Sequence, residues 1–257
     1  MKRKFFTVRT IAGMGILSAM VVVLQLLSNY VQFGPVSITL ALFPIAVGAM
    51  LYGPIGGMLL GLLDGVLVLT APSTISFFFA ITPFGTIITC LGKTAIAGLV
   101  AGFIFKLYQR DIKAEFVAAL LLLPNIILCS TDRIFEGTLA SLSYGKVIVS
   151  LVRFINVGAF AALIIKGLIK PTKNSVILLT SLSVPVINTG IFIICAMTFF
   201  APKIVPMATA SGQNVINFLI FAFIGWNFFL EFAINAFLAS SFHNIYESIN
   251  NKISRGR

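Results

Sequence analysis

Several polar side chains lie deep inside apolar stretches of this chain, and these side chains could bind or relay charge. Asp64, Lys93, Asn188 and Asn227 are examples. At 1.5 Å per residue, Lys93, Asn188 and Asn227 lie roughly 15 to 18 Å from the nearer end of their apolar stretches and Asp64 lies roughly 10 Å from its own, all well inside a bilayer about 30 Å thick. Polar groups are costly in lipid, so each is a hypothesis for a functional site.

The last apolar stretch carries a polar face. Glu231 and Asn235 follow Asn227 at i+4 and i+8, and Trp226 beside them offers a flat apolar surface with one N–H donor. Such a face must contact protein or water in a membrane. It predicts either a ligand site or a structural seam, in which interhelical hydrogen bonds or an ion pair with Lys93 hold the helices together.

Other patterns argue against an enzyme. The run Gly92–Thr94 resembles the end of a phosphate-binding loop, but the earlier glycine of that motif would fall at Ile87 and no strand precedes it. The only histidine, His243, lies at the predicted cytoplasmic end of the last span, and the three cysteines lack metal-ligand spacing, so nothing resembles a serine-hydrolase or zinc site. We therefore expect no catalytic activity, no metal and no cofactor bound by this chain.

The composition indicates the environment of these residues. Of 257 residues, 59% are hydrophobic and 10% are charged, against roughly 45–50% and 25% in soluble domains. The apolar runs do not alternate as barrel strands do, so the spanning elements are helices. The net charge of +11 fits basic residues beside spans and anionic lipid, and we expect no nucleic-acid partner.

The fold class predicted is all-α, a polytopic transmembrane helical bundle forming one domain over residues 1–257. The basic start MKRKFF leads into an apolar run without a persuasive cleavage site, which favours a retained first helix. About eight spans are expected, three of them short, near 9–28, 37–52, 54–71, 83–106, 115–131, 147–168, 174–200 and 216–241.

Lys and Arg residues predict the orientation of the chain, because cytoplasmic loops are enriched in them. With a cytoplasmic N-terminus, the inner side holds Lys2, Arg3, Lys4, Arg9, Lys106, Arg110, Lys113, Lys166, Lys170, Lys173, Lys252, Arg255 and Arg257. The outer side holds Arg133, Lys146 and Lys203. This asymmetry predicts an even number of spans, with both termini in the cytoplasm.

Two uncharged loops on the predicted outer side, 29–36 and 72–82, are rich in aromatic residues. They could close over a small ligand or form an aromatic belt at the membrane interface. Both interpretations remain open from the sequence.

Small residues recur four apart. Gly53, Gly57, Gly61 and Gly65 share one helix face, where another backbone can approach closely. The face serves either packing within the bundle or a smooth contact with a separate membrane subunit. The pair Gly15 and Ala19 offers a second face with the same two interpretations.

Parts of the chain resemble substrate-binding S components of energy-coupling factor (ECF) transporters. The resemblance covers roughly 8–108 and 174–247, and residues 109–172 form an inserted apolar segment. It is carried by Ser37–Gly57 (SITLALFPIAVGAMLYGPIGG), by Pro83–Thr86 leading into 98–102, by Pro185–Gly190, and by Trp226 and Asn227 with Glu231 and Asn235. The implied architecture is a six-helix core with an inserted helical pair.

The resemblance implies a plasma-membrane subunit that binds a vitamin or cofactor precursor. Its partners would be a transmembrane coupling subunit and two cytoplasmic ATPases, which use the ATP. By position, the resemblance assigns substrate binding to Phe33, Phe84, Lys93, Asn188, Trp226, Asn227 and Glu231. We expect the partner interface at Gly15, Ala19, Gly57 and Gly61.

Lys93 could pair with a ligand carboxylate, which favours pantothenate or another anionic vitamin over riboflavin. The main alternative is a stand-alone secondary transporter in which Asp64, Lys93 and Glu231 relay protons or ions. A repeated half of the sequence would favour that alternative, and only a faint similarity joins 92–108 and 153–169.

Overall fold

The fold was analysed in a computed structural model of the chain, which describes residues 7–30, 32–33, 36–108, 173–224, 227–239 and 241–242. The inserted segment 109–172, with the spans expected at 115–131 and 147–168, lies outside the described residues. So does Trp226.

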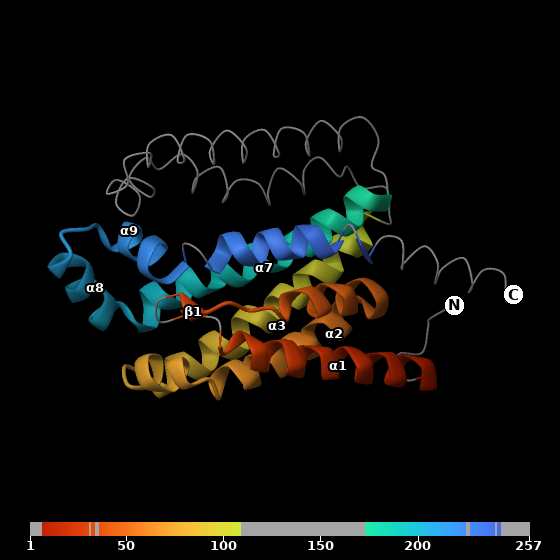
Figure 1. The fold of residues 1–257 in the computed structure, drawn as a ribbon, viewed down its shortest axis with the longest axis horizontal. Helices are drawn as coiled ribbons and strands as arrows, with labels where there is room; N and C mark the ends of the chain where they lie inside the picture. Colours follow the sequence, from red (N-terminus) through yellow and green to blue (C-terminus); the bar gives the residue numbers. More distant parts are fainter. Residues whose placement is uncertain are drawn as a thin grey trace, which may run out of the picture.

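The described chain is helical except for one short hairpin (Figure 1). The first half contains α1 (Val8–Ser28), β1 (Gln32–Phe33), β2 (Val36–Ser37), α2 (Leu42–Leu69), the π-helix η1 (Thr74–Phe79) and α3 (Pro83–Tyr108). The second half contains α7 (Lys173–Phe199), α8 (Ala201–Ala210), α9 (Val215–Leu219), the π-helix η2 (Ile220–Ile224) and a last helix Asn227–Ala239. The two strands are antiparallel, with Gln32 opposite Ser37 and Phe33 opposite Val36.

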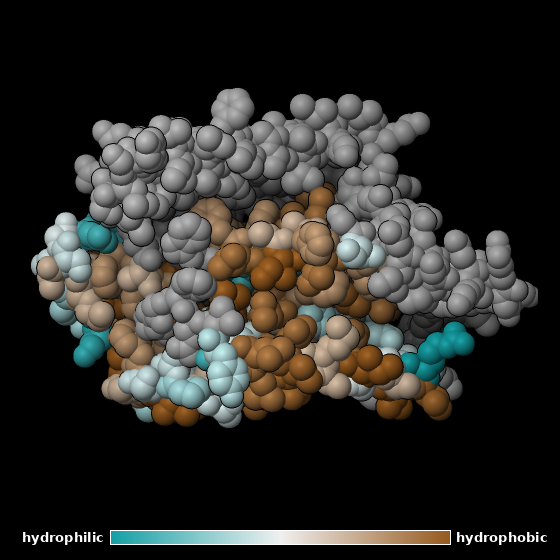
Figure 2. All heavy atoms as spheres, viewed as in Figure 1, coloured by the Kyte–Doolittle hydropathy of each residue, from teal (hydrophilic) through white to brown (hydrophobic). Residues whose placement is uncertain are grey.

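Within the described residues, four helices are long and apolar enough to cross a membrane: α1, α2, α3 and α7. The pair Asn217–Ile224 and Asn227–Ala239, bent by 58°, makes a fifth if it is counted as one span. The prediction of a helical membrane protein agrees with this result. Figure 2 shows hydrophobic residues across the middle of the visible face and the most hydrophilic ones toward its two ends.

The long helices run lengthwise and bring related elements to the same end (Figure 1). The start of α1, the end of α3 and the start of α7 share one end of the bundle. Arg9, Lys106 and Lys173 are part of these helix ends in the sequence. The strands, η1 and α8 share the other end. The predicted spans 9–28, 83–106 and 174–200 therefore correspond to α1, α3 and α7 within two residues.

The two segments expected as separate spans, 37–52 and 54–71, both fall in α2, as arms of 11 and 16 residues on either side of Gly53. Each arm is shorter than the roughly 17–25 residues of a membrane span, so α2 counts as one of the four apolar helices. The chain reverses at Gly53, whose φ of 79° and ψ of −172° are not helical, just before Pro54. A methyl group placed on Gly48 would collide with Leu60, although residues twelve apart in a straight helix are about 18 Å apart. The first arm begins only at Leu42, because strand β2 and a turn occupy the residues before it.

Replacing Gly53 by alanine should destabilise the chain by about 1–3 kcal/mol, because its backbone conformation is nearly exclusive to glycine. Thermal unfolding in detergent would measure the loss. Gly15→Ala is the matched control, since Gly15 is exposed, has no described atom within 4 Å of an added methyl group, and lies within α1. Equal melting temperatures for Gly53→Ala and wild type would contradict the assigned turn.

The glycine ladder packs α2 against α3 inside the chain. A methyl group at Gly57 would strike the carbonyl of Gly98, one at Gly61 that of Thr94, and one at Gly65 that of Cys90, which lies 2.6 Å away. The contacts advance by four residues on α2 while they retreat by four on α3, so the two helices are antiparallel. The Thr94 hydroxyl also donates to the Gly61 carbonyl at 2.6 Å.

This packing corrects the expectation that Gly57 and Gly61 form a partner interface. Both glycines are buried, and the backbone of α3 already fills the space beside them. Gly15 and Ala19 are exposed on α1, as a contact surface requires.

Candidate functional site

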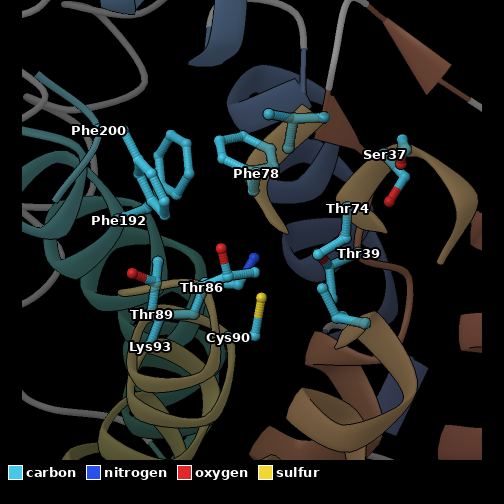
Figure 3. Close-up of a pocket in the computed structure, with 13 residues that line it drawn as sticks. Ser37, Thr39, Thr74, Phe78, Thr86, Thr89, Cys90, Lys93, Phe192 and Phe200 are labelled. Atoms are coloured by element: carbon cyan, nitrogen blue, oxygen red, sulfur yellow. The ribbon is translucent and has the colours of Figure 1, made fainter. Parts of the chain in front are cut away.

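A polar cavity lies beside α3, at the end of the bundle that holds the strands, η1 and the aromatic residues Phe78, Phe192 and Phe200. Its lining residues are Val36, Ser37, Thr39, Val68, Ser73, Thr74, Phe78, Thr86, Thr89, Cys90, Lys93, Phe192 and Phe200. Figure 3 shows Thr86, Thr89, Cys90 and Lys93 on one side, Ser37, Thr39 and Thr74 on the other, and Phe78 near Phe192 and Phe200.

The empty volume is about 420 Å³, counting the part that is open to the outside. Because this value includes open solvent, it is larger than the space that a bound ligand could fill. The enclosed part has room for only one or two water molecules. A vitamin-sized ligand therefore requires part of the wall to move outward.

Helix α3 supplies the first wall. Thr86, Thr89, Cys90 and Lys93 are spaced i, i+3, i+4 and i+7, which places them on one helix face. The Thr86 hydroxyl donates to the Thr82 carbonyl at 2.8 Å, and the Thr89 hydroxyl donates to the Gly85 carbonyl at 2.7 Å. Because each hydroxyl has one proton, these threonines offer the cavity only their lone pairs.

Lys93 is the cation of this wall. Its side chain is 6% exposed, and its Nζ lies 5.9 Å from the centre of the Phe192 ring. In Figure 3 the lysine nitrogen points into the space between the two walls. Among the residues that the structure describes, no carboxylate oxygen lies within ion-pair distance, 4.0 Å, of this nitrogen, and no hydrogen bond to it is found.

Two buried carboxyl groups lie within electrostatic range of Lys93, those of Asp64 and Glu231. Neither residue lines the cavity. Asp64 is fully buried on α2, and its two carboxyl oxygens have no hydrogen-bond partner among the described residues. Of the three charged side chains, Lys93 alone therefore lines the cavity, while the carboxyl groups of Asp64 and Glu231 lie outside its lining.

The last helix holds the second wall. The Glu231 carboxylate accepts a hydrogen bond from the Thr39 backbone N–H at 2.8 Å, and the Asn227 amide donates to the Val36 carbonyl at 2.9 Å. Thr39 and Val36 both line the cavity. Asn227 and Glu231 thus act as positioning residues that fix a cavity wall.

Glu231→Ala should cost about 1–3 kcal/mol, because it leaves the buried Thr39 N–H without its acceptor. Glu231→Gln is the matched control, since its amide oxygen still accepts that hydrogen bond. Unfolding of both variants in detergent would measure the difference. If Glu231 instead contacts ligand through its charge, Glu231→Gln will weaken binding at unchanged stability, which would contradict a positioning role.

Phe78 is the centre of an aromatic cluster at one end of the cavity. Its ring centre lies 5.0 Å from those of Phe77 and Phe200, 6.0 Å from Phe192 and 6.2 Å from Phe223. These residues come from η1, η2, α7 and the bend between α7 and α8. The loop expected at 72–82 is therefore largely a π-helix that places Phe78 inside, while Ile75 of the same helix is 53% exposed.

The structure brings together only part of the predicted substrate-binding set. Lys93 lines the cavity, and Asn227 and Glu231 support its wall. Asn188 is buried on α7, 4% exposed, but does not line the cavity. Phe84 is 69% exposed at the start of α3 and is not among the lining residues.

Phe33 lies in β1, opposite Val36, and its side chain lies outside the described part of the structure, as does Trp226. Thr86 and Thr89 were not predicted from the sequence as lining residues. Their helical spacing with Lys93, which places all three on one face of α3, is the pattern that could have indicated them. Hydroxyls at Ser37, Thr39 and Thr74 carried no such pattern.

Comparison with known proteins returned no match: no family model, no curated protein and no solved structure corresponds to this chain.

Proposed function

We propose that this chain is the substrate-binding subunit of an ATP-driven, ECF-type importer in the plasma membrane, with both termini in the cytoplasm. It captures a vitamin or cofactor precursor from outside and delivers it together with a coupling subunit and two ATPases. The observation that carries the proposal is the hydroxyl-lined cavity with buried Lys93, enclosed by segments far apart in sequence. Membrane proteins retain buried cations where they bind or move charge.

The exposure of α1 supports a membrane partner. Only 17% of its apolar stretch is buried within the chain, against 56% to 67% of the apolar stretches of α2, α3 and α7. Gly15 and Ala19 lie exposed on this helix, and small residues allow another helix to approach closely. We assign this surface to the coupling subunit.

Co-expression with a coupling subunit and two ATPases, followed by affinity purification, tests the proposal. The expected result is one complex that takes up a labelled vitamin in vesicles only when ATP is supplied on the ATPase side. Gly15→Leu should reduce recovery of the complex, while the chain alone remains folded. Uptake by the purified chain alone, without ATPases, would overturn the proposal.

The buried carboxyl of Asp64 supports one second candidate, a secondary transporter with a relay through Asp64, Lys93 and Glu231. An acid without a hydrogen-bond partner in the described structure, near a lysine and another acid, is suited to carry a proton. In that case the chain alone would transport, and Asp64→Asn would stop uptake. Under the importer proposal, Asp64→Asn retains ATP-dependent uptake.

A further inference from the structure

The geometry points to a small monocarboxylate as the ligand, one that carries hydroxyl or amide N–H donors and an apolar part. This inference rests on the proposed function and names the class of substrate. It is drawn from three features of the cavity: its charge, the hydrogen-bonding state of its hydroxyls, and the position of its aromatic residues.

The charge of Lys93 favours a ligand with one negatively charged group, and only one. Lys93 is the only Lys or Arg among the described lining residues, and no described anion pairs with it. A ligand carboxylate would give it a charge-assisted hydrogen bond in a site with little water. A second negative charge on the ligand would find no cation in the described wall and would lie near Asp64 and Glu231.

The hydroxyl groups on α3 favour a ligand that carries hydrogen-bond donors. The Thr86 and Thr89 hydroxyls donate their protons to the backbone carbonyls four residues earlier, so toward the cavity they accept hydrogen bonds. A ligand hydroxyl or amide N–H beside the carboxylate matches these acceptors. A ligand rich in carbonyl groups, with few donors, would leave them unpaired.

The aromatic residues of the lining favour a ligand with an apolar part. Phe78, Phe192 and Phe200 line the cavity at its aromatic end, and Phe192 lies next to the lysine nitrogen. A ligand with its carboxylate on Lys93 would therefore extend its remaining carbon atoms toward these rings. Burial of such a segment contributes about 25 cal/mol per Å² of apolar surface.

The test compares each acid with a neutral partner of nearly the same shape. Detergent-purified chain is screened by thermal shift and titration calorimetry with pantothenate and pantothenol, biotin and biotinamide, and nicotinate and nicotinamide, with riboflavin and thiamine added. One acid should bind more tightly than its neutral partner by about 10- to 150-fold, the range of a hydrogen bond to a charged group. Lys93→Gln should remove that difference, whereas Lys106→Gln, an exposed lysine outside the cavity, should preserve it.

The comparison of each acid with its neutral partner uses the wild-type chain, so it gives a result even if Lys93→Gln does not fold. Equal affinity for an acid and its neutral partner, or tightest binding by riboflavin or thiamine, would overturn the monocarboxylate while the binding function stands. Binding of none of these compounds to a folded chain would overturn both. An acid preference that persists in Lys93→Gln would overturn the role of Lys93.

Discussion

Gly61→Leu is expected to prevent the chain from reaching a stable folded state. The position beside Gly61 is filled by the backbone of Thr94 and Ala95 on α3, which cannot move aside as a side chain can. The two helices would have to separate and lose the Thr94 to Gly61 hydrogen bond of 2.6 Å. A loss on the order of 4 kcal/mol or more follows, a large share of the roughly 5–15 kcal/mol that stabilises most proteins.

The fraction of monodisperse protein after detergent extraction would measure this effect. Gly15→Leu is the control, because no described atom lies within 4 Å of a methyl group added at this exposed glycine. Gly98→Leu should behave like Gly61→Leu, since a side chain there would meet the backbone of Gly57. A stable, monodisperse Gly61→Leu protein would show that the α2–α3 contact is wrong.

Phe78→Ala is expected to lower stability by about 3–5 kcal/mol, the usual cost of truncating a buried aromatic residue. The ring contacts Phe77, Phe192, Phe200 and Phe223 at centre distances of 5.0 to 6.2 Å. Removing it leaves a void that these rings fill only in part. It also removes a lining residue at the aromatic end of the cavity, so ligand should bind more weakly and dissociate faster.

Ile75→Ala is the matched control, because Ile75 lies on the same π-helix and is 53% exposed. Thermal unfolding and ligand dissociation, measured on both variants, would separate an interior Phe78 from one in an interfacial belt. Similar small effects at positions 75 and 78 would favour the belt. Phe78→Leu, which keeps much of the apolar volume, should recover part of the stability.

The sequence was a good guide to the long elements. Apolar runs predicted α1, α3 and α7 nearly to the residue, because a helix that crosses lipid must pair its own backbone groups along its whole length. The Gly53–Pro54 turn was expected, and the structure places it between the arms of α2. Lys93 stood out in the sequence because a lysine within an apolar helix is costly in lipid and must face protein or water.

The sequence was a poor guide to the direction in which side chains point. Phe84 was assigned to the ligand by resemblance, but it lies 69% exposed, while Phe78 lies inside. Glu231 and Asn227 were expected at the ligand, yet both hold backbone groups of Thr39 and Val36. Such pairings join residues 192 and 191 positions apart, and local periodicity has no information about them.

By itself, the sequence determined that this is a helical membrane protein and that costly polar residues lie within its apolar segments. Only the tertiary structure decided which of these residues face a common space. The reason is physical: the glycines of α2 and α3 fix how α3 is rotated against α2, and that rotation turns Lys93 and its threonines toward the cavity. Composition and spacing set the residues available on each helix face, but close backbone packing sets where that face points.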